Sequence, residues 1–109
     1  MTWGEELYKE TIYESPSRLL SKVWRDRVLL IKPSTFKTII EPISVKLDFR
    51  VMDSYKKDLD NLVKGALDLL TDRGIISDDA LVCSIESTKH AIERPEREKI
   101  HIKIYRWVG

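Results

Sequence analysis

Cysteine, glycine and proline are all scarce in this chain of 109 residues. A single cysteine, Cys83, excludes an internal disulfide framework and any zinc site built from several cysteines. Four Gly and four Pro are too few for a disordered or low-complexity chain, and a hydrophobic fraction of 42% suits a compact fold. A chain of this length builds one hydrophobic core, so we expect a single domain over residues 1–109.

Signals for membranes or export are also missing. The sequence contains no apolar run long enough to cross a bilayer. Its start, MTWGEELYKE, has neither the basic end nor the apolar block of a signal peptide. We therefore expect a cytoplasmic protein without a membrane partner. Cys83 lies in the apolar stretch ALVCSIES, where a small buried side chain is a more common role than a nucleophile.

The chain as a whole has almost no excess of one charge sign, but its segments do. The formal net charge is +1, whereas DNA-binding proteins usually carry a basic excess. Residues 58–79 contain six Asp against Lys64 and Arg73, a net charge of −4, so the remaining residues carry +5. An acidic spot in basic surroundings is the layout expected of a metal-dependent enzyme that acts on a polyanion.

Hydrophobic periodicity predicts an α+β fold. Strict alternation over residues 43–51 predicts a half-buried strand. Apolar side chains at helical spacing over residues 59–70 predict an amphipathic helix that ends at Gly74. A further helix is expected from an N-cap at Ser15 to a stop at Pro33. Weaker alternation predicts strands at residues 7–13, 80–87 and 99–108. We therefore expect a mixed or antiparallel sheet of about four strands with two helices packed on it.

Aspartates gather around the start of the second helix. Asp58 and Asp60 flank that start, and either is a natural N-cap. Lys64 lies one turn beyond Asp60 on the polar face. Asp78 and Asp79 lead into the following strand and join the first pair if this strand packs beside the helix N-terminus. Three carboxylates at a separation of about 4 Å repel by about 4 kcal/mol per pair at an effective dielectric constant near 20, so a cation must lie among them.

The chemistry of these groups favours Mg²⁺ or Mn²⁺, although each residue also has a structural interpretation. Oxygen ligands without His or Cys suit these ions, which activate water and neutralise charge on a phosphodiester. Lys64 could stabilise the same charge. Taken alone, Asp58 or Asp60 is more often a helix cap than a ligand, and Lys64 fits a surface lysine. Asp68 and Asp72 are expected to be solvated helix charges outside the site. Spacing alone leaves both interpretations open.

The string KKDLDNLVKGALDLLTDRGIISDDALV resembles the signature of the RusA-type Holliday junction resolvases, small endodeoxyribonucleases of bacteria and phages. The matching parts are DLDN, a lysine four residues after its second aspartate, ALDLL, a glycine, and DD before the next strand. The resemblance covers residues 56–88 well. A long gapped pattern of this kind is more specific than an isolated pair of aspartates.

The resemblance implies both the active residues and the reaction. The family's catalytic, metal-binding aspartates fall on Asp58, Asp60 and Asp79, and its essential lysine falls on Lys64. The implied fold is a small mixed domain that forms a two-fold homodimer. The implied activity is hydrolysis that depends on Mg²⁺ or Mn²⁺, without an organic cofactor, and that cuts two strands symmetrically across a four-way junction.

Contacts with DNA are expected close to these residues. Lys56, Lys57 and Lys64 are the candidates for phosphate contacts, although a basic pair in a loop commonly serves only solubility. Two alternatives to a junction resolvase stay open: a branched-DNA-binding module that does not cleave, and a nuclease for other branched DNA such as flaps and forks. The retention of all three aspartates and the lysine argues against the first alternative.

Overall fold

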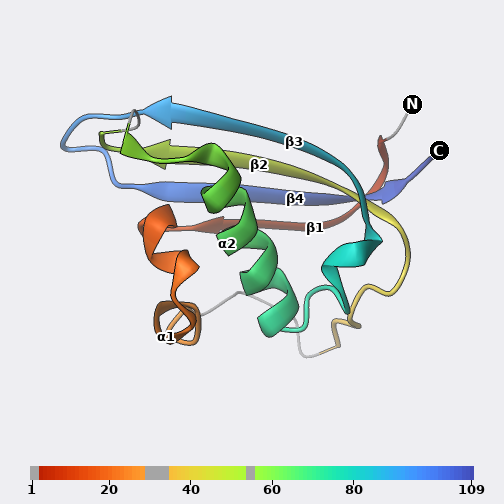
Figure 1. Ribbon diagram of the computed structural model, residues 1–109. Helices are drawn as coiled ribbons and strands as arrows, with labels where there is room; N and C mark the ends of the chain where they lie inside the picture. Colours follow the sequence, from red (N-terminus) through yellow and green to blue (C-terminus); the bar gives the residue numbers. More distant parts are fainter. Residues whose placement is uncertain (1–2, 29–34, 54–55) are drawn as a thin grey trace.

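The computed structural model describes residues 3–28, 35–53 and 56–109. They form one four-stranded sheet with the helices on one of its faces (Figure 1). The strand order is β1-β4-β2-β3, in which β2 and β3 are parallel and the other two pairs are antiparallel. The mixed sheet of the α+β class is thereby confirmed. The strands are β1 (Trp3–Ile12), β2 (Ile43–Val51), β3 (Val82–Ala91) and β4 (Lys99–Trp107).

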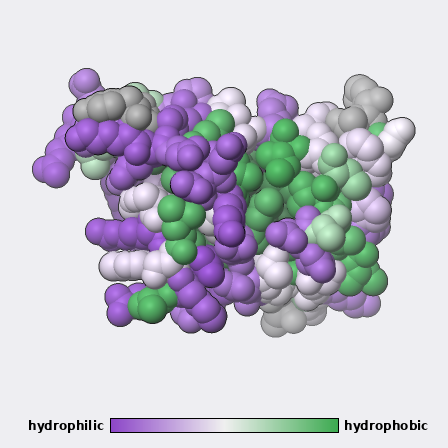
Figure 2. Space-filling model, in the orientation of Figure 1, coloured by the Kyte–Doolittle hydropathy of each residue, from purple (hydrophilic) through white to green (hydrophobic). Residues whose placement is uncertain are grey.

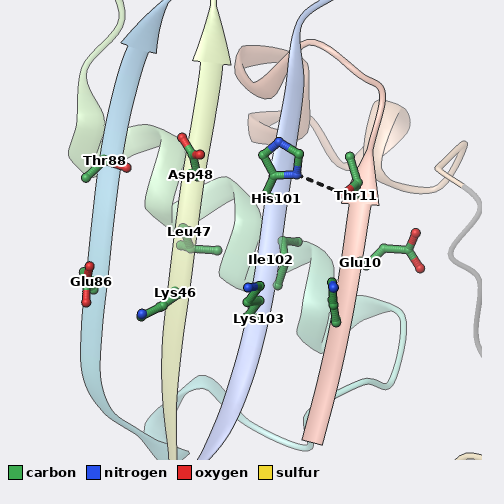
Figure 3. Close-up of a pocket in the computed structure, with 11 residues that line it drawn as sticks. Glu10, Thr11, Lys46, Leu47, Asp48, Glu86, Thr88, His101, Ile102 and Lys103 are labelled. Carbon is green, nitrogen blue, oxygen red and sulfur yellow. Dashed lines mark hydrogen bonds between the residues drawn. The ribbon is translucent and has the colours of Figure 1, made fainter. Parts of the chain in front are cut away.

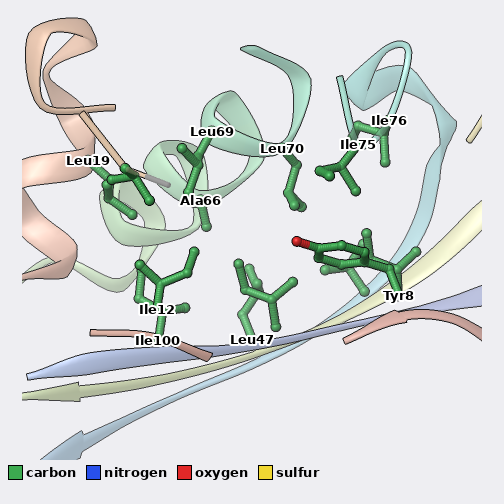
Figure 4. Packing of buried hydrophobic residues seen from close by; sticks show 14 of the residues in the cluster. Tyr8, Ile12, Leu19, Leu47, Ala66, Leu69, Leu70, Ile75, Ile76 and Ile100 are labelled. Atoms are coloured by element: carbon green, nitrogen blue, oxygen red, sulfur yellow. The ribbon is translucent and has the colours of Figure 1, made fainter. Parts of the chain in front are cut away.

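The helix α2 (Leu59–Asp72) crosses the sheet and supplies one wall of the core. Its apolar stripe packs against the inward side chains of the strands, as Figure 4 shows. Burial raises the pKa of the Tyr8 phenol in this core, so its hydroxyl stays neutral at physiological pH. No helix within residues 3–28, 35–53 and 56–109 has the length and apolar character of a membrane span. Core residues visible in Figure 4 include Ile12, Leu19, Leu47, Ala66, Leu69, Leu70, Ile75, Ile76 and Ile100.

The first helical region is broken rather than continuous. A 3-10 helix, η1 (Pro16–Leu20), is followed by one α-helical turn, α1 (Lys22–Arg25), and Ser21 between them has an extended backbone (φ −96, ψ 128). The prediction of one helix from Ser15 is therefore wrong, and the Ser15 side chain makes no capping hydrogen bond. The predicted stop at Pro33 lies outside the described residues.

Packing against α2 explains this break. Leu19 is fully buried and Arg25 is only 9% exposed. In a continuous helix these side chains, six positions apart, would point about 120° away from each other. The extended residue between η1 and α1 lets both of them face the same neighbour.

Arg25 ties this region to α2 through a part-buried cluster. Its Nε donates a hydrogen bond to Oδ2 of Asp72 at 2.8 Å, and its Nη1 donates to the Leu19 carbonyl oxygen at 2.8 Å. Its Nη1 also lies 3.9 Å from a carboxylate oxygen of Asp68. Asp68 and Asp72 therefore serve the fold, which corrects the expectation of solvated charges and leaves them outside the site.

Gly65 sets the distance between α2 and η1. A Cβ atom at this position would lie 3.2 Å from the Leu19 carbonyl carbon and 3.3 Å from its oxygen. These neighbours are backbone atoms, which cannot turn aside as a flexible side chain can. Any side chain at this position would therefore require the backbone of η1 to shift by a few tenths of an ångström.

Replacement of Gly65 tests this contact. We expect Gly65→Val to lower the free energy of unfolding by about 2 kcal/mol because the added atoms push η1 away from α2. The matched control is Asn61→Val on the exposed face of the same helix, which should change stability by less than about 0.5 kcal/mol. Urea denaturation measures both values. Equal stability of the two variants would contradict the close approach.

Candidate active site

Two of the predicted aspartates lie together at the start of α2. Asp58 is the N-cap residue, and its Oδ1 accepts a hydrogen bond from the backbone N–H of Asp60 at 3.1 Å. Both side chains are exposed. A carboxylate at the N-cap position accepts a hydrogen bond from an N–H group that would otherwise be unpaired. The positive end of the helix dipole stabilises the second carboxylate, that of Asp60. The helix start thus presents two carboxylates to solvent without cost to the fold.

Basic side chains surround this pair. Lys64 is exposed one turn further along α2, while Lys56 and Lys57 lie in the connection just before the helix. The ammonium group of Lys89 donates a hydrogen bond to the Lys57 carbonyl oxygen. Asp53, with a positive φ of 52°, makes the turn that begins this connection. The space-filling view shows a mostly hydrophilic surface over this end of the molecule (Figure 2).

Sequence patterns gave no sign of Lys89. It lies near the end of β3, opposite Phe49 of β2, and reaches the connection only because these strands are parallel. Strand pairing between distant segments has no local signature, so a lysine in an alternating strand is not distinguishable from a solubilising one.

The third predicted aspartate lies in a different setting. Asp78 caps the short 3-10 helix η3 (Asp79–Leu81), and its Oδ1 accepts from the Ala80 backbone N–H at 2.8 Å. Asp79 is the first residue of η3 and is exposed. Within the described part of the chain, its carboxylate makes no hydrogen bond or ion pair. The fold therefore uses the first aspartate of the pair and leaves the second available.

One chain does not bring Asp79 to the other two aspartates. Asp79 precedes the first residue of β3, whereas the connection before Asp58 contacts Lys89 near the last residue of that strand. Seven residues of strand separate these points, which corresponds to about 23 Å. In Figure 1, α2 begins beside the arrowheads of β2 and β3, and η3 lies at the tail of β3. Among the described residues, no group of three acidic, His or Cys side chains is placed to hold a metal ion.

Strand direction is the physical reason for this separation. Because β2 and β3 are parallel, the chain must return along the sheet through α2 before β3 begins. The start of α2 then lies at the carboxyl ends of both strands, and η3 lies at their amino ends. The condition under which Asp79 would join the first pair, packing of the start of β3 beside the helix N-terminus, is therefore not met within one chain.

The uncovered face of the sheet carries a shallow hollow of about 550 Å³. Its walls combine both charge signs, including Lys46, Lys103, Asp48 and Glu86 (Figure 3). His101 lines it as well, with its Nδ1 2.9 Å from Oγ1 of Thr11. This hollow lies on the opposite face from α2, and none of the predicted site residues lines it.

Comparison with known proteins identifies the family. A family model described as endodeoxyribonuclease RusA matches residues 9–105. This range includes the start of α2, η3 and every residue predicted to act in the site. A search of curated proteins found no match. Because the family match spans most of the 109 residues, the chain belongs to the RusA family of endodeoxyribonucleases.

Proposed function

We propose that this protein is a homodimeric endonuclease that resolves four-way DNA junctions, with Mg²⁺ or Mn²⁺ held between its two subunits. Membership of the RusA family supports hydrolysis of branched DNA. The observation that carries the shared site is the placement of Asp79 at the opposite end of β3 from Asp58 and Asp60. The expected setting is the cytoplasm of a bacterium, with the gene on the chromosome or on a phage.

The shared site follows from charge and distance. Mg²⁺ is usually held by one or two carboxylates together with waters and substrate phosphates, which the pair at the start of α2 can supply. A third carboxylate at the other end of β3, across about 23 Å of strand, cannot contribute to the same ion. A two-fold dimer with antiparallel subunits places Asp79 of the partner subunit beside Asp58 and Asp60, and it does so twice.

The donor set fits such an ion. Asp58, Asp60 and Asp79 offer hard oxygen ligands, all three are exposed, and the carboxylate of Asp79 has no competing partner among the described residues. When bound, a divalent ion supplies an activated water and a counter-charge for the phosphodiester.

The chain's own basic residues orient the DNA. Lys64 lies one turn beyond Asp60, so its ammonium group is placed to stabilise negative charge that develops on the cut phosphate. Lys56 and Lys57 contact neighbouring phosphates, which fixes the position of the strand without reading its sequence. Lys89 holds the Lys57 carbonyl and thereby restricts the connection that carries both lysines.

Symmetry connects the site to a junction substrate. A two-fold dimer presents two equal sites, and a four-way junction has two strands of like polarity in nearly equivalent positions. Symmetric cutting of both strands follows. Flaps and forks offer only one such strand, so comparison of cleavage rates on junctions, flaps and forks tests the choice of substrate.

A non-cleaving DNA-binding module is the competing proposal. A structural role accounts for Asp58 as a helix cap and for Asp78 as the cap of η3. It gives no account of Asp79, whose carboxylate is exposed and without a partner in the described part of the chain. This unused carboxylate favours the nuclease.

Removal of the Asp79 charge tests the catalytic role. We expect Asp79→Asn to slow Mg²⁺-dependent cutting of a labelled synthetic junction by at least about 100-fold, because a metal ligand is lost. Junction binding without metal should be unchanged or tighter because a negative charge near DNA is removed. The control is Asp26→Asn, which removes an exposed carboxylate paired with Lys22 and should cut normally. Undiminished cutting by Asp79→Asn would show that Asp79 is not part of the catalytic site.

Mixed dimers test whether the site is shared. Asp60→Asn and Asp79→Asn should each be inactive as homodimers. In a mixed dimer one site combines both substitutions, and the other combines two unaltered halves. Random exchange makes about half of the dimers mixed, so about a quarter of all sites should cut. The measurement is nicking of a supercoiled cruciform plasmid after the two variants are mixed and re-equilibrated. If the mixture stays as inactive as its components, the site lies within one chain.

A further inference from the structure

β3 is an unprotected edge of the sheet. In the described part of the chain, its only strand neighbour is β2. It is ten residues long and contains no proline, and after one register shift between Val82 and Ser84 it keeps a regular register with β2 to Ala91. Long, regular edges present a row of backbone groups that readily pair with another strand.

The other edge of the sheet is protected. β1 has two register shifts between Trp3 and Tyr8, which disrupt the ladder that an incoming strand would follow. It also contains several charged residues, Glu5, Glu6, Lys9 and Glu10. β3 has charged side chains only at Glu86 and Lys89, and Lys89 already bonds the Lys57 carbonyl. Register shifts and charges thus protect the β1 edge more strongly, and β3 is open from Ser84 onward.

Apolar side chains are exposed along the open edge. Ile85 is 41% exposed, and Cys83, which the sequence predicts to be buried, is also exposed. Cys83 lies at the register shift between Val82 and Ser84, whereas Ile85 lies opposite Val45 in the regular part of the strand. Glu86 and Thr88 line the hollow on the uncovered face, so Ile85 points to the face that carries the helices (Figure 3).

We propose that β3 pairs antiparallel with β3 of a second copy, which joins the two four-stranded sheets into one continuous sheet. The proposal rests on the shared site proposed above, because that site selects the pairing. A two-fold axis normal to the sheet keeps both α2 helices on one face, and paired strands lie about 4.8 Å apart. The η3 segment of the partner subunit then lies beside the end of β3 where α2 begins.

The shared site also fixes the register. Asp79 of the partner subunit must lie level with the start of α2, and Lys57 in the connection just before α2 contacts β3 at Lys89. The midpoint between positions 79 and 89 is Ser84, so the two-fold axis passes near Ser84. The two exposed Ile85 side chains then lie diagonally across the axis on the face that carries the helices, within reach of each other.

Pairing of β3 with a second copy of this chain accounts for more of the observations than the two alternatives do. A strand from an unrelated protein would satisfy the backbone groups of β3 but would bring no carboxylate to the start of α2. Packing of two subunits through the uncovered faces would bury Lys46, Lys103, Asp48 and Glu86, and such charges are costly to remove from water. Edge pairing avoids that cost.

A charge at the interface tests the pairing. We expect Ile85→Lys to weaken the dimer at least tenfold, because it replaces an apolar side chain at the interface and brings two like charges near the axis. The matched control is Val23→Lys on α1, where the side chain is 60% exposed and distant from β3, and it should dimerise normally. Sedimentation equilibrium measures both dissociation constants, and circular dichroism checks that each variant folds.

A cysteine on the two-fold axis gives a second test, which does not depend on whether Ile85→Lys folds stably. In a Cys83→Ser background, Ser84→Cys should form a covalent dimer on mild oxidation, because only positions close to the axis meet the short Cα separation of a disulfide. The control, Glu6→Cys on the β1 edge in the same background, should remain uncrosslinked.

The outcomes separate this interface from the shared site. If Ile85→Lys stays dimeric and Ser84→Cys does not crosslink, while mixed Asp60→Asn and Asp79→Asn subunits recover nicking, the shared site stands and β3 is not the interface. If the mixture recovers nothing but Ser84→Cys crosslinks, the interface stands and the shared site fails. A wild-type protein that is monomeric while it cuts overturns both.

Discussion

The parallel pairing of β2 with β3 decides what this chain can do alone. Parallel neighbours require a crossover, and α2 is that crossover, so its first residue and the first residue of β3 lie at opposite ends of the sheet. Burial of the apolar faces of α2 and β2 holds this arrangement in place. Asp79 is therefore held away from Asp58 and Asp60 by the core itself, and no small adjustment of a loop can bring them together.

In the proposed dimer, this fixed separation makes association necessary for a complete site. Each end of the sheet then contributes part of the proposed metal-binding set, with two carboxylates at one end and one at the other. Neither part alone strains the fold, because Asp58 caps α2 and Asp79 is solvated. In the proposed dimer, the repulsion expected among three carboxylates arises only when two subunits meet, and a divalent ion then offsets it. The proposal therefore links metal binding thermodynamically to dimerisation.

Local patterns predicted those parts of the structure that depend on local physics. Strict alternation gave β2, and helical spacing gave α2, because a single buried face determines each. The break at Ser21 escaped prediction because it depends on two side chains six positions apart that both contact α2. The exposure of Cys83 was not predicted because an apolar strand sequence does not show whether the strand lies at the edge of the sheet. The location of Asp79 depends on strand direction, which no short motif encodes.

Binding of Mn²⁺ to the unmodified protein, followed by electron paramagnetic resonance above and below the dimer dissociation constant, tests the shared site most directly. The account predicts that the ion binds much more tightly at protein concentrations where dimers dominate, because three carboxylates then surround it instead of two. Equal affinity in the monomer and the dimer would contradict it, since one chain would then hold the ion without help from the other.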